Sequence, residues 1–432
     1  MTPAPPTSRV AFLKKWGRLG AGAGAGQLVV QATAFLSGLV IIRLLPQEEY
    51  AFYTLANTML FTMGMLADGG IASGVTALGG EVWQSRTELG KVLATGIRLR
   101  NRFALACLVV VMPITFYLYT KRDISTAGIL IILAALIPTF VTTLSSGLYK
   151  VIPQLHQHIR PLVRVNVLGN VTRLATTVGA LLLLPYAAVA MLCSGIAQFQ
   201  VNRQLKSLMA TDADASATWD PAIQSKILGF TKRSLPTSIY YALSGQITVW
   251  LLSIFGTTGS IAEVGALSRL MVVFTLVSMT VDLLVAPRFA RLPKGSPAVV
   301  LRFLQACAVG VAVGGAVVLT VWLIPDVLLL VLGSQYDDLQ YELLLISISS
   351  TLWMITNLVS KLAASRGILP NPVGFIASQI LVQTLFIAFV VDYTSLTGVL
   401  YLSIATVVAT LAYRLIHFLL SVGPGKRAAE VA

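Results

Sequence analysis

The chain has 432 residues, of which 56% are hydrophobic and 11% are charged. Soluble domains contain about 45–50% apolar and about 25% charged residues, so the charges here are too few to cover a globular surface in water. The formal net charge of +14 would suggest nucleic-acid binding in a soluble protein. Here the Lys and Arg residues gather in alternate loops, as they do on the cytoplasmic side of membrane proteins. The composition therefore predicts an all-α polytopic membrane protein that does not bind nucleic acid.

Two long apolar runs open the chain, at residues 20–45 and 50–79, and a turn containing Glu48 and Glu49 separates them. A helix of about 25 residues rises roughly 38 Å, which is enough to cross a hydrocarbon core of about 30 Å with some tilt. Hydropathy and breaker residues extend this pattern to about twelve predicted spans, at 20–45, 50–79, 103–120, 125–149, 163–184, 186–205, 232–256, 262–287, 299–324, 343–363, 372–391 and 396–420.

The loops between these spans differ in charge. Basic residues fill the N-terminal segment and every second connection, whereas acids such as Glu48, Asp123 and Asp392 gather in the others. This bias predicts an even number of spans with both termini in the cytoplasm. Cys107 and the other two cysteines lie inside apolar runs without paired spacing, and His156 and His158 have no Cys nearby, so neither a disulfide framework nor a metal site is predicted.

The middle of the chain carries a polar connection at residues 209–226, rich in Ala, Asp, Ser and Thr. We interpret it as a cytoplasmic linker between an N-terminal six-helix lobe, 1–208, and a C-terminal six-helix lobe, 227–432. A single gapless shift lays Arg18 on Lys232, Glu49 on Glu263 and Asp68 on Asp282. The sequence therefore predicts two pseudo-symmetric repeats, an architecture that is common in transporters.

Four stretches resemble a known family. Residues Ile42–Leu55 and Leu66–Ile71 resemble the opening of Wzx-like flippases, the polysaccharide transporters of the multidrug/oligosaccharidyl-lipid/polysaccharide (MOP) exporter superfamily. Residues Leu330–Asp338 and Lys361–Gly367 are similar to the ninth-to-tenth helix region of that family.

The resemblance implies two six-helix bundles that form a V around a central cavity. It further implies a cargo of undecaprenyl-diphosphate-linked oligosaccharide, moved across the bacterial inner membrane by alternating access for surface polysaccharide assembly. A polysaccharide polymerase would then be a partner, and no cofactor is expected. No nucleotide-binding motif is present, so an H+ or Na+ gradient or consumption of the product must drive transport.

Moving a polar glycan needs a hydrated route, and a diphosphate favours cations along it, so charges inside the spans are the first candidates. Arg173 lies near the middle of the fifth predicted span, and Asn170 shares its helical face. Arg269 lies a quarter of the way into the eighth span. We interpret these three residues as substrate contacts, although Arg173 could instead pair with an acid between helices and Arg269 could instead snorkel to the membrane interface.

Two acids occupy equivalent places in the two halves. Asp68 and Asp282 lie near the cytoplasmic ends of the second and eighth spans, where a poorly hydrated carboxylate could exchange protons or bind a cation. The alternative is structural, because both acids precede helix irregularities and could satisfy freed backbone groups or pair with an inner-loop Arg. The structural role is favoured.

Uncharged polar residues on apolar helices are weaker substrate candidates, namely Gln31, Tyr240 and Gln246. Hydrogen bonds between helices explain each of them nearly as well. Two rival functions stay open. A cation-coupled multidrug exporter of the same superfamily would be expected to carry an acid in the first helix, which has none, or a cluster of acids in one lobe. A membrane glycan polymerase would need a larger outer loop than residues 325–342.

Overall fold

The computed structural model describes residues 9–122, 124–280, 285, 289, 298–366, 368, 371–389 and 392–422. Every regular element in these ranges is helical. The α-helices are α1 (Arg9–Leu44), α2 (Gln47–Asp68), α3 (Ile71–Glu81), α4 (Arg86–Thr120), α5 (Thr126–Tyr149), α6 (Val151–Leu155), α7 (Ile159–Leu181), α8 (Ala187–Met209), α9 (Pro221–Ser244), α10 (Ile247–Ile254), α11 (Thr258–Leu270), α12 (Val273–Thr280), α14 (Ala298–Leu323), α15 (Pro325–Leu332), α16 (Gln340–Ala364), α17 (Pro372–Phe389) and α18 (Leu396–Val422), and Ser334–Tyr336 form a 3-10 turn.

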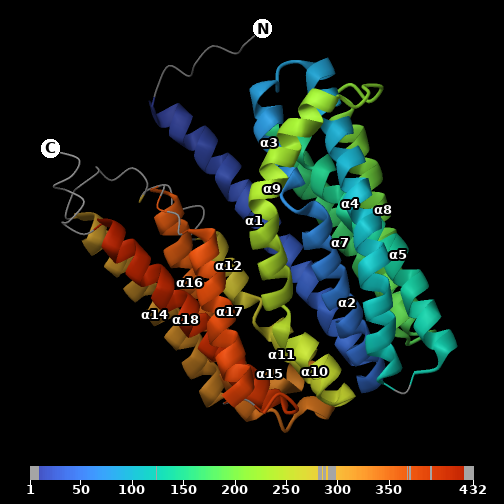
Figure 1. Cartoon of the computed structure of the whole chain (residues 1–432), viewed down its shortest axis with the longest axis vertical. Helices are drawn as coiled ribbons and strands as arrows, with labels where there is room; N and C mark the ends of the chain where they lie inside the picture. Colours follow the sequence, from blue (N-terminus) through green and yellow to red (C-terminus); the bar gives the residue numbers. More distant parts are fainter. Residues whose placement is uncertain are drawn as a thin grey trace. The chain divides into compact units, whose positions relative to one another are not determined.

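The helices pack into two compact units. The first comprises Met1–Glu49 and Ala56–Leu243, and the second comprises Tyr50–Leu55 and Ser244–Ala432. In the first unit α5 lies along α8, α1 lies along α7, and α7 also packs on α8 (Figure 1). In the second unit α16 packs against both α14 and α18, and Phe303 stacks on Phe418 with 4.0 Å between ring centroids.

Six described helical segments are long and apolar enough to cross a membrane alone: Gly26–Leu44, Arg86–Thr120, Thr126–Leu155, Val299–Leu323, Gln340–Ala364 and Leu396–Ser421. Their exposed side chains include many large hydrophobic residues, such as Leu105, Val109 and Leu420. Such a surface is stable against lipid chains rather than water. The prediction of an all-α polytopic membrane protein is confirmed.

Several predicted spans consist of two shorter helices. The span at 50–79 is α2 followed by α3, because Gly69 and Gly70 adopt φ of +46° and +94°, values that favour glycine. The N–H of Gly69 donates to Met65 O at 3.0 Å and closes α2 immediately after Asp68. The spans at 232–256 and 262–287 are likewise divided, between α9 and α10 and between α11 and α12.

The central connection is shorter than the expected linker at 209–226. It covers residues 210–220, because Asp220 and Pro221 start α9 earlier. The Asp220 carboxylate accepts hydrogen bonds from the N–H groups of Ala222 (2.7 Å) and Ile223 (3.4 Å), as a helix cap does. Ile227 is fully buried in a core cluster with Ile71 of α3. Residues 221–243 therefore pack with the first unit, and the boundary follows Leu243 rather than the expected linker.

Candidate functional site

A polar cavity of about 410 Å³ lies inside the first unit. Its wall is built by α1, α2, α5, α7 and α8, together with the residue that ends α5. The polar lining residues are Gln27, Asn57, Thr139, Thr143, Lys150, Asn166, Asn170, Arg173, Ser194 and Gln198. Polar side chains inside an apolar bundle are costly unless they serve packing or a hydrated route, so this cavity is the candidate site.

Helix α7 supplies three of these residues from one face. Asn166, Asn170 and Arg173 are spaced by four and three residues, so they follow one another along one side of the helix. The Asn170 amide donates to Asn166 O at 3.0 Å, which fixes its orientation. The Nε of Arg173 is buried and has no hydrogen-bond partner within the described residues. A buried donor of this kind is stabilised by a ligand or by water that accepts from it.

Another part of the wall is stabilised by hydrogen bonds between α5 and α8. The Thr139 hydroxyl donates to Met191 O at 3.0 Å, and the Asn202 amide donates to Thr142 O at 2.7 Å. Gln198, one turn before Asn202, lines the cavity. Bonds of this kind between neighbouring helices keep the lining residues in place.

The charge of the lining is entirely positive. Arg173 and Lys150 line the cavity, whereas no carboxylate is among the lining residues that the structure describes. Guanidinium and ammonium groups beside neutral amides are chemically suited to hydrogen-bond an anion that also carries hydroxyl or amide groups.

Asp68 lies in a neighbouring cavity of about 280 Å³, which shares Leu60 and Thr143 with the first. Its Oδ1 lies 3.8 Å from Nη1 of Arg100 on α4. Arg100 is 4% exposed and also donates to Ser145 O at 3.2 Å. Asp68 therefore pairs with a basic residue, as expected if its role is structural. A role of Asp68 in ion coupling stays a prediction.

Arg269 lies in the second unit, at the end of α11. Its guanidinium interacts with the hydroxyls of Tyr50 and Tyr53. These tyrosines belong to the first turns of α2, which pack with the second unit. Three cavities within the described residues do not include Arg269 among their lining residues, and its role as a substrate contact stays a prediction.

The other predicted site residues lie elsewhere. Tyr240 is buried on α9 with its ring against Tyr241, and Gln246 occupies the break between α9 and α10. Gln31 lies one turn beyond Gln27 on α1, and only Gln27 lines the polar cavity. Asp282 lies outside the described residues. No group of three or more His, Cys, Asp or Glu side chains that could hold a metal ion occurs in the described part of the chain.

Sequence reasoning missed Lys150 as a site residue, because a Lys at the end of an apolar run is counted as a loop charge. In the structure α6 follows Lys150 directly, so the side chain stays beside the helical bundle. A signal was available in the sequence, since the apolar run continues with Val151 and Ile152 after Lys150.

Comparison with protein-family models and with curated proteins gave no match. Solved structures do match in fold. An inward-facing multidrug resistance MATE family transporter of the MOP superfamily is 13% identical, with a TM-score of 0.68 over 90% of this chain and 93% of that one. The lipid II flippase MurJ in an inward closed conformation is also 13% identical, with a TM-score of 0.68 over 93% of this chain and 87% of the flippase.

A third match is a MOP superfamily transporter from Pyrococcus furiosus Vc1, whose description states that reversed polarity of its binding pocket suggests a different function. It is 15% identical, with a TM-score of 0.60 over 93% of each chain. The three matched proteins are described as transporters or a flippase rather than as enzymes. At these identities the similarity establishes the fold alone, and the chain accordingly shares the all-helical membrane fold of these three proteins.

Proposed function

We propose that the protein translocates a polyprenyl-diphosphate-linked oligosaccharide across the bacterial inner membrane, with both termini in the cytoplasm, for surface polysaccharide assembly. The observation that carries the proposal is the cavity of the first unit, in which Arg173 and Lys150 lie among amide side chains and no described lining residue is a carboxylate. A diphosphate followed by sugars has the complementary chemistry, since it offers anionic oxygens first and hydroxyl or acetamido groups next.

The volume of the cavity suits only part of the proposed cargo. Ligand pockets usually measure about 300–1,000 Å³, so 410 Å³ suits a diphosphate with the first sugar and not a whole oligosaccharide. Alternating access would expose this site to each side of the membrane in turn. Coupling of transport to H+ or Na+ and supply of product to a polysaccharide polymerase belong to the same proposal. Asp282 is a coupling candidate, and Asp68 is a weaker one because it pairs with Arg100.

The rival function is multidrug export, for which the matched multidrug resistance transporter is named. A site for organic cations favours carboxylates and aromatic faces, whereas the lining of this cavity is basic and rich in amides. The lining therefore favours an anionic cargo.

The test is transport in proteoliposomes loaded with a fluorescent undecaprenyl-diphosphate glycan. Arg173→Gln should reduce the rate about ten- to hundredfold, because a hydrogen bond from a charged group contributes about 1.5–3 kcal/mol. Arg160→Gln is the matched control, since Arg160 is an exposed residue of the same helix that does not line the cavity. Efflux of organic cations without glycan movement would overturn the proposal.

A further inference from the structure

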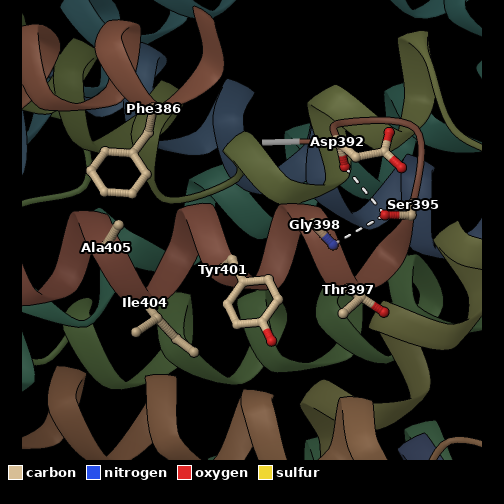
Figure 2. A pocket seen from close by; sticks show the side chains of 8 residues that line it. All are labelled: Phe386, Asp392, Ser395, Thr397, Gly398, Tyr401, Ile404 and Ala405. Atoms are coloured by element: carbon tan, nitrogen blue, oxygen red, sulfur yellow. Dashed lines mark hydrogen bonds between the residues drawn. The ribbon is translucent and has the colours of Figure 1, made fainter. Parts of the chain in front are cut away.

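A second large cavity lies in the second unit, between the end of α17 and the start of α18 (Figure 2). Its volume is about 650 Å³. It is lined by Phe386, Asp392, Ser395, Thr397, Gly398, Tyr401, Ile404 and Ala405. None of these residues lines the polar cavity of the first unit, and the proposed translocation of a glycan does not use them.

One end of this groove is charged. The Asp392 carboxylate accepts hydrogen bonds from the Thr394 hydroxyl (2.6 Å) and the Thr394 N–H (3.0 Å), and these bonds lower the pKa of Asp392 from its usual value. Asp392 is therefore an anion at neutral pH. It is also exposed, so its second oxygen can meet a cation in the groove.

The start of α18 lies at the same end. The Ser395 hydroxyl oxygen accepts from the Gly398 N–H at 3.1 Å, and the side chains of Ser395 and Thr397 border the groove (Figure 2). This bond caps the Gly398 N–H, so the partial positive charge at the start of the long helix is what favours a phosphate nearby. A carboxylate and a helix N-terminus thus border one end of the cavity together.

The rest of the groove is apolar and follows α18. Thr397, Tyr401, Ile404 and Ala405 share one face of that helix over roughly 12 Å, and the Phe386 ring of α17 lies opposite. The neighbouring surfaces of both helices carry exposed hydrophobic residues, namely Ile380, Leu381, Leu385 and Val408. A groove on such a surface is accessible to lipid chains.

We propose that this groove binds one phospholipid with an ethanolamine headgroup. The ammonium group pairs with Asp392, the phosphate meets the N-terminus of α18, and one acyl chain lies along Phe386, Tyr401 and Ile404. An anionic phospholipid is disfavoured because Asp392 and Glu342, which accepts a hydrogen bond from the Thr397 hydroxyl at 2.7 Å, add negative charge nearby. A choline headgroup has no N–H to donate to the carboxylate.

Native mass spectrometry of the purified full chain tests this site. The probes are phosphatidylethanolamine, phosphatidylcholine and phosphatidylglycerol, each with the same acyl chains. One phosphatidylethanolamine molecule should be retained about fivefold more than either other lipid, which is the upper range for an exposed ion pair. Asp392→Asn should remove this preference while a lipid is still retained, because an amide keeps the acceptor for Thr394 but loses the charge. Asp326→Asn, at another exposed outer acid, is the control.

Substitutions that fill the groove test whether it binds the acyl chain. Ile404→Trp should abolish retention, whereas Leu381→Trp, on a 60% exposed residue of α17 that does not line the groove, should not. Ala405→Leu narrows the same groove with a smaller change. It should also reduce lipid retention, and it replaces Ile404→Trp as the test if that variant does not fold. Equal retention of all three lipids, or retention unchanged by both groove variants, would show lipid bound nonspecifically around the protein and overturn the proposal.

Discussion

Asp68, the last residue of α2, forms an ion pair with Arg100 of α4, with 3.8 Å between Oδ1 and Nη1. The Arg100 side chain is 4% exposed and that of Asp68 is 33% exposed, so the pair lies at the edge of a cavity with the cation on the buried side. An almost buried guanidinium needs its partner, because the cost of desolvating the charge is otherwise uncompensated. The relationship favours a structural role for Asp68 over ion coupling.

Asp68→Asn should therefore destabilise the protein. Breaking a fully buried pair costs about 3–5 kcal/mol, and the partial exposure of Asp68 reduces this to about 1–3 kcal/mol. The measurement is the thermal unfolding midpoint in detergent. Glu88→Gln, which removes the surface ion pair with Lys91 on the same helix as Arg100, is the control and should change little. A stable Asp68→Asn variant whose transport no longer responds to a pH gradient would favour the coupling role instead.

Lys150→Gln should weaken binding of pyrophosphate to the purified protein about tenfold, because the basic cavity loses one of its two lining cations. The double variant Lys150→Gln/Arg173→Gln should lose binding completely. The measurement is isothermal titration at low ionic strength. The matched control is Lys206→Gln, since Lys206 lies over the Tyr149 ring, 5.3 Å from its centroid, and does not line the cavity. If Lys206→Gln weakened pyrophosphate binding equally, the effect would reflect the net charge of the protein and not the lining of the cavity.

The sequence predicted the membrane class and the helical pattern well, because apolar runs of this length have few other stable forms. It also placed Asn170 and Arg173 on one helical face, and both line the cavity. It could not place Arg269, because the charge pattern does not reveal that Tyr50 and Tyr53 of α2 pack against that residue in the second unit. Lys150 was missed for a similar reason, since its position depends on how α5 continues into α6.

The boundary between the two units is another feature that the sequence pattern alone did not reveal. Polar composition marked 209–226 as a linker, but the Asp-Pro pair at Asp220 and Pro221 starts a helix within it. Whether α9 then packs with the helices before or after it depends on apolar contacts such as that of Ile227 with Ile71. Contacts over such sequence distances are not encoded in local periodicity.

Asp220→Ala should destabilise the start of α9 by about 0.5–2 kcal/mol, because the N–H groups of Ala222 and Ile223 lose their acceptor. Amide hydrogen exchange of residues 222–226 is the measurement, and their protection should fall. Asp220→Asn keeps a side-chain oxygen at the cap and should retain most of the protection. If both variants exchange alike, the negative charge of Asp220 rather than its capping hydrogen bonds stabilises this helix.

Gly70→Ala should be strongly destabilising, because two effects act together at the break between α2 and α3. Gly70 has φ of +94°, which an L side chain rarely adopts, and a Cβ there would lie 2.6 Å from the Cβ of Ser234. The expected loss is about 1–3 kcal/mol, measured as a lower thermal unfolding midpoint. Gly64→Ala is the matched control, because Gly64 lies inside α2 and a Cβ there would meet nothing within 4 Å. That control should be neutral or stabilised by about 0.4–1 kcal/mol, since alanine restricts the unfolded chain. A Gly70→Ala variant as stable as Gly64→Ala would mean that α2 and α3 can join as one continuous helix, so the break after Asp68 would not be fixed by glycine.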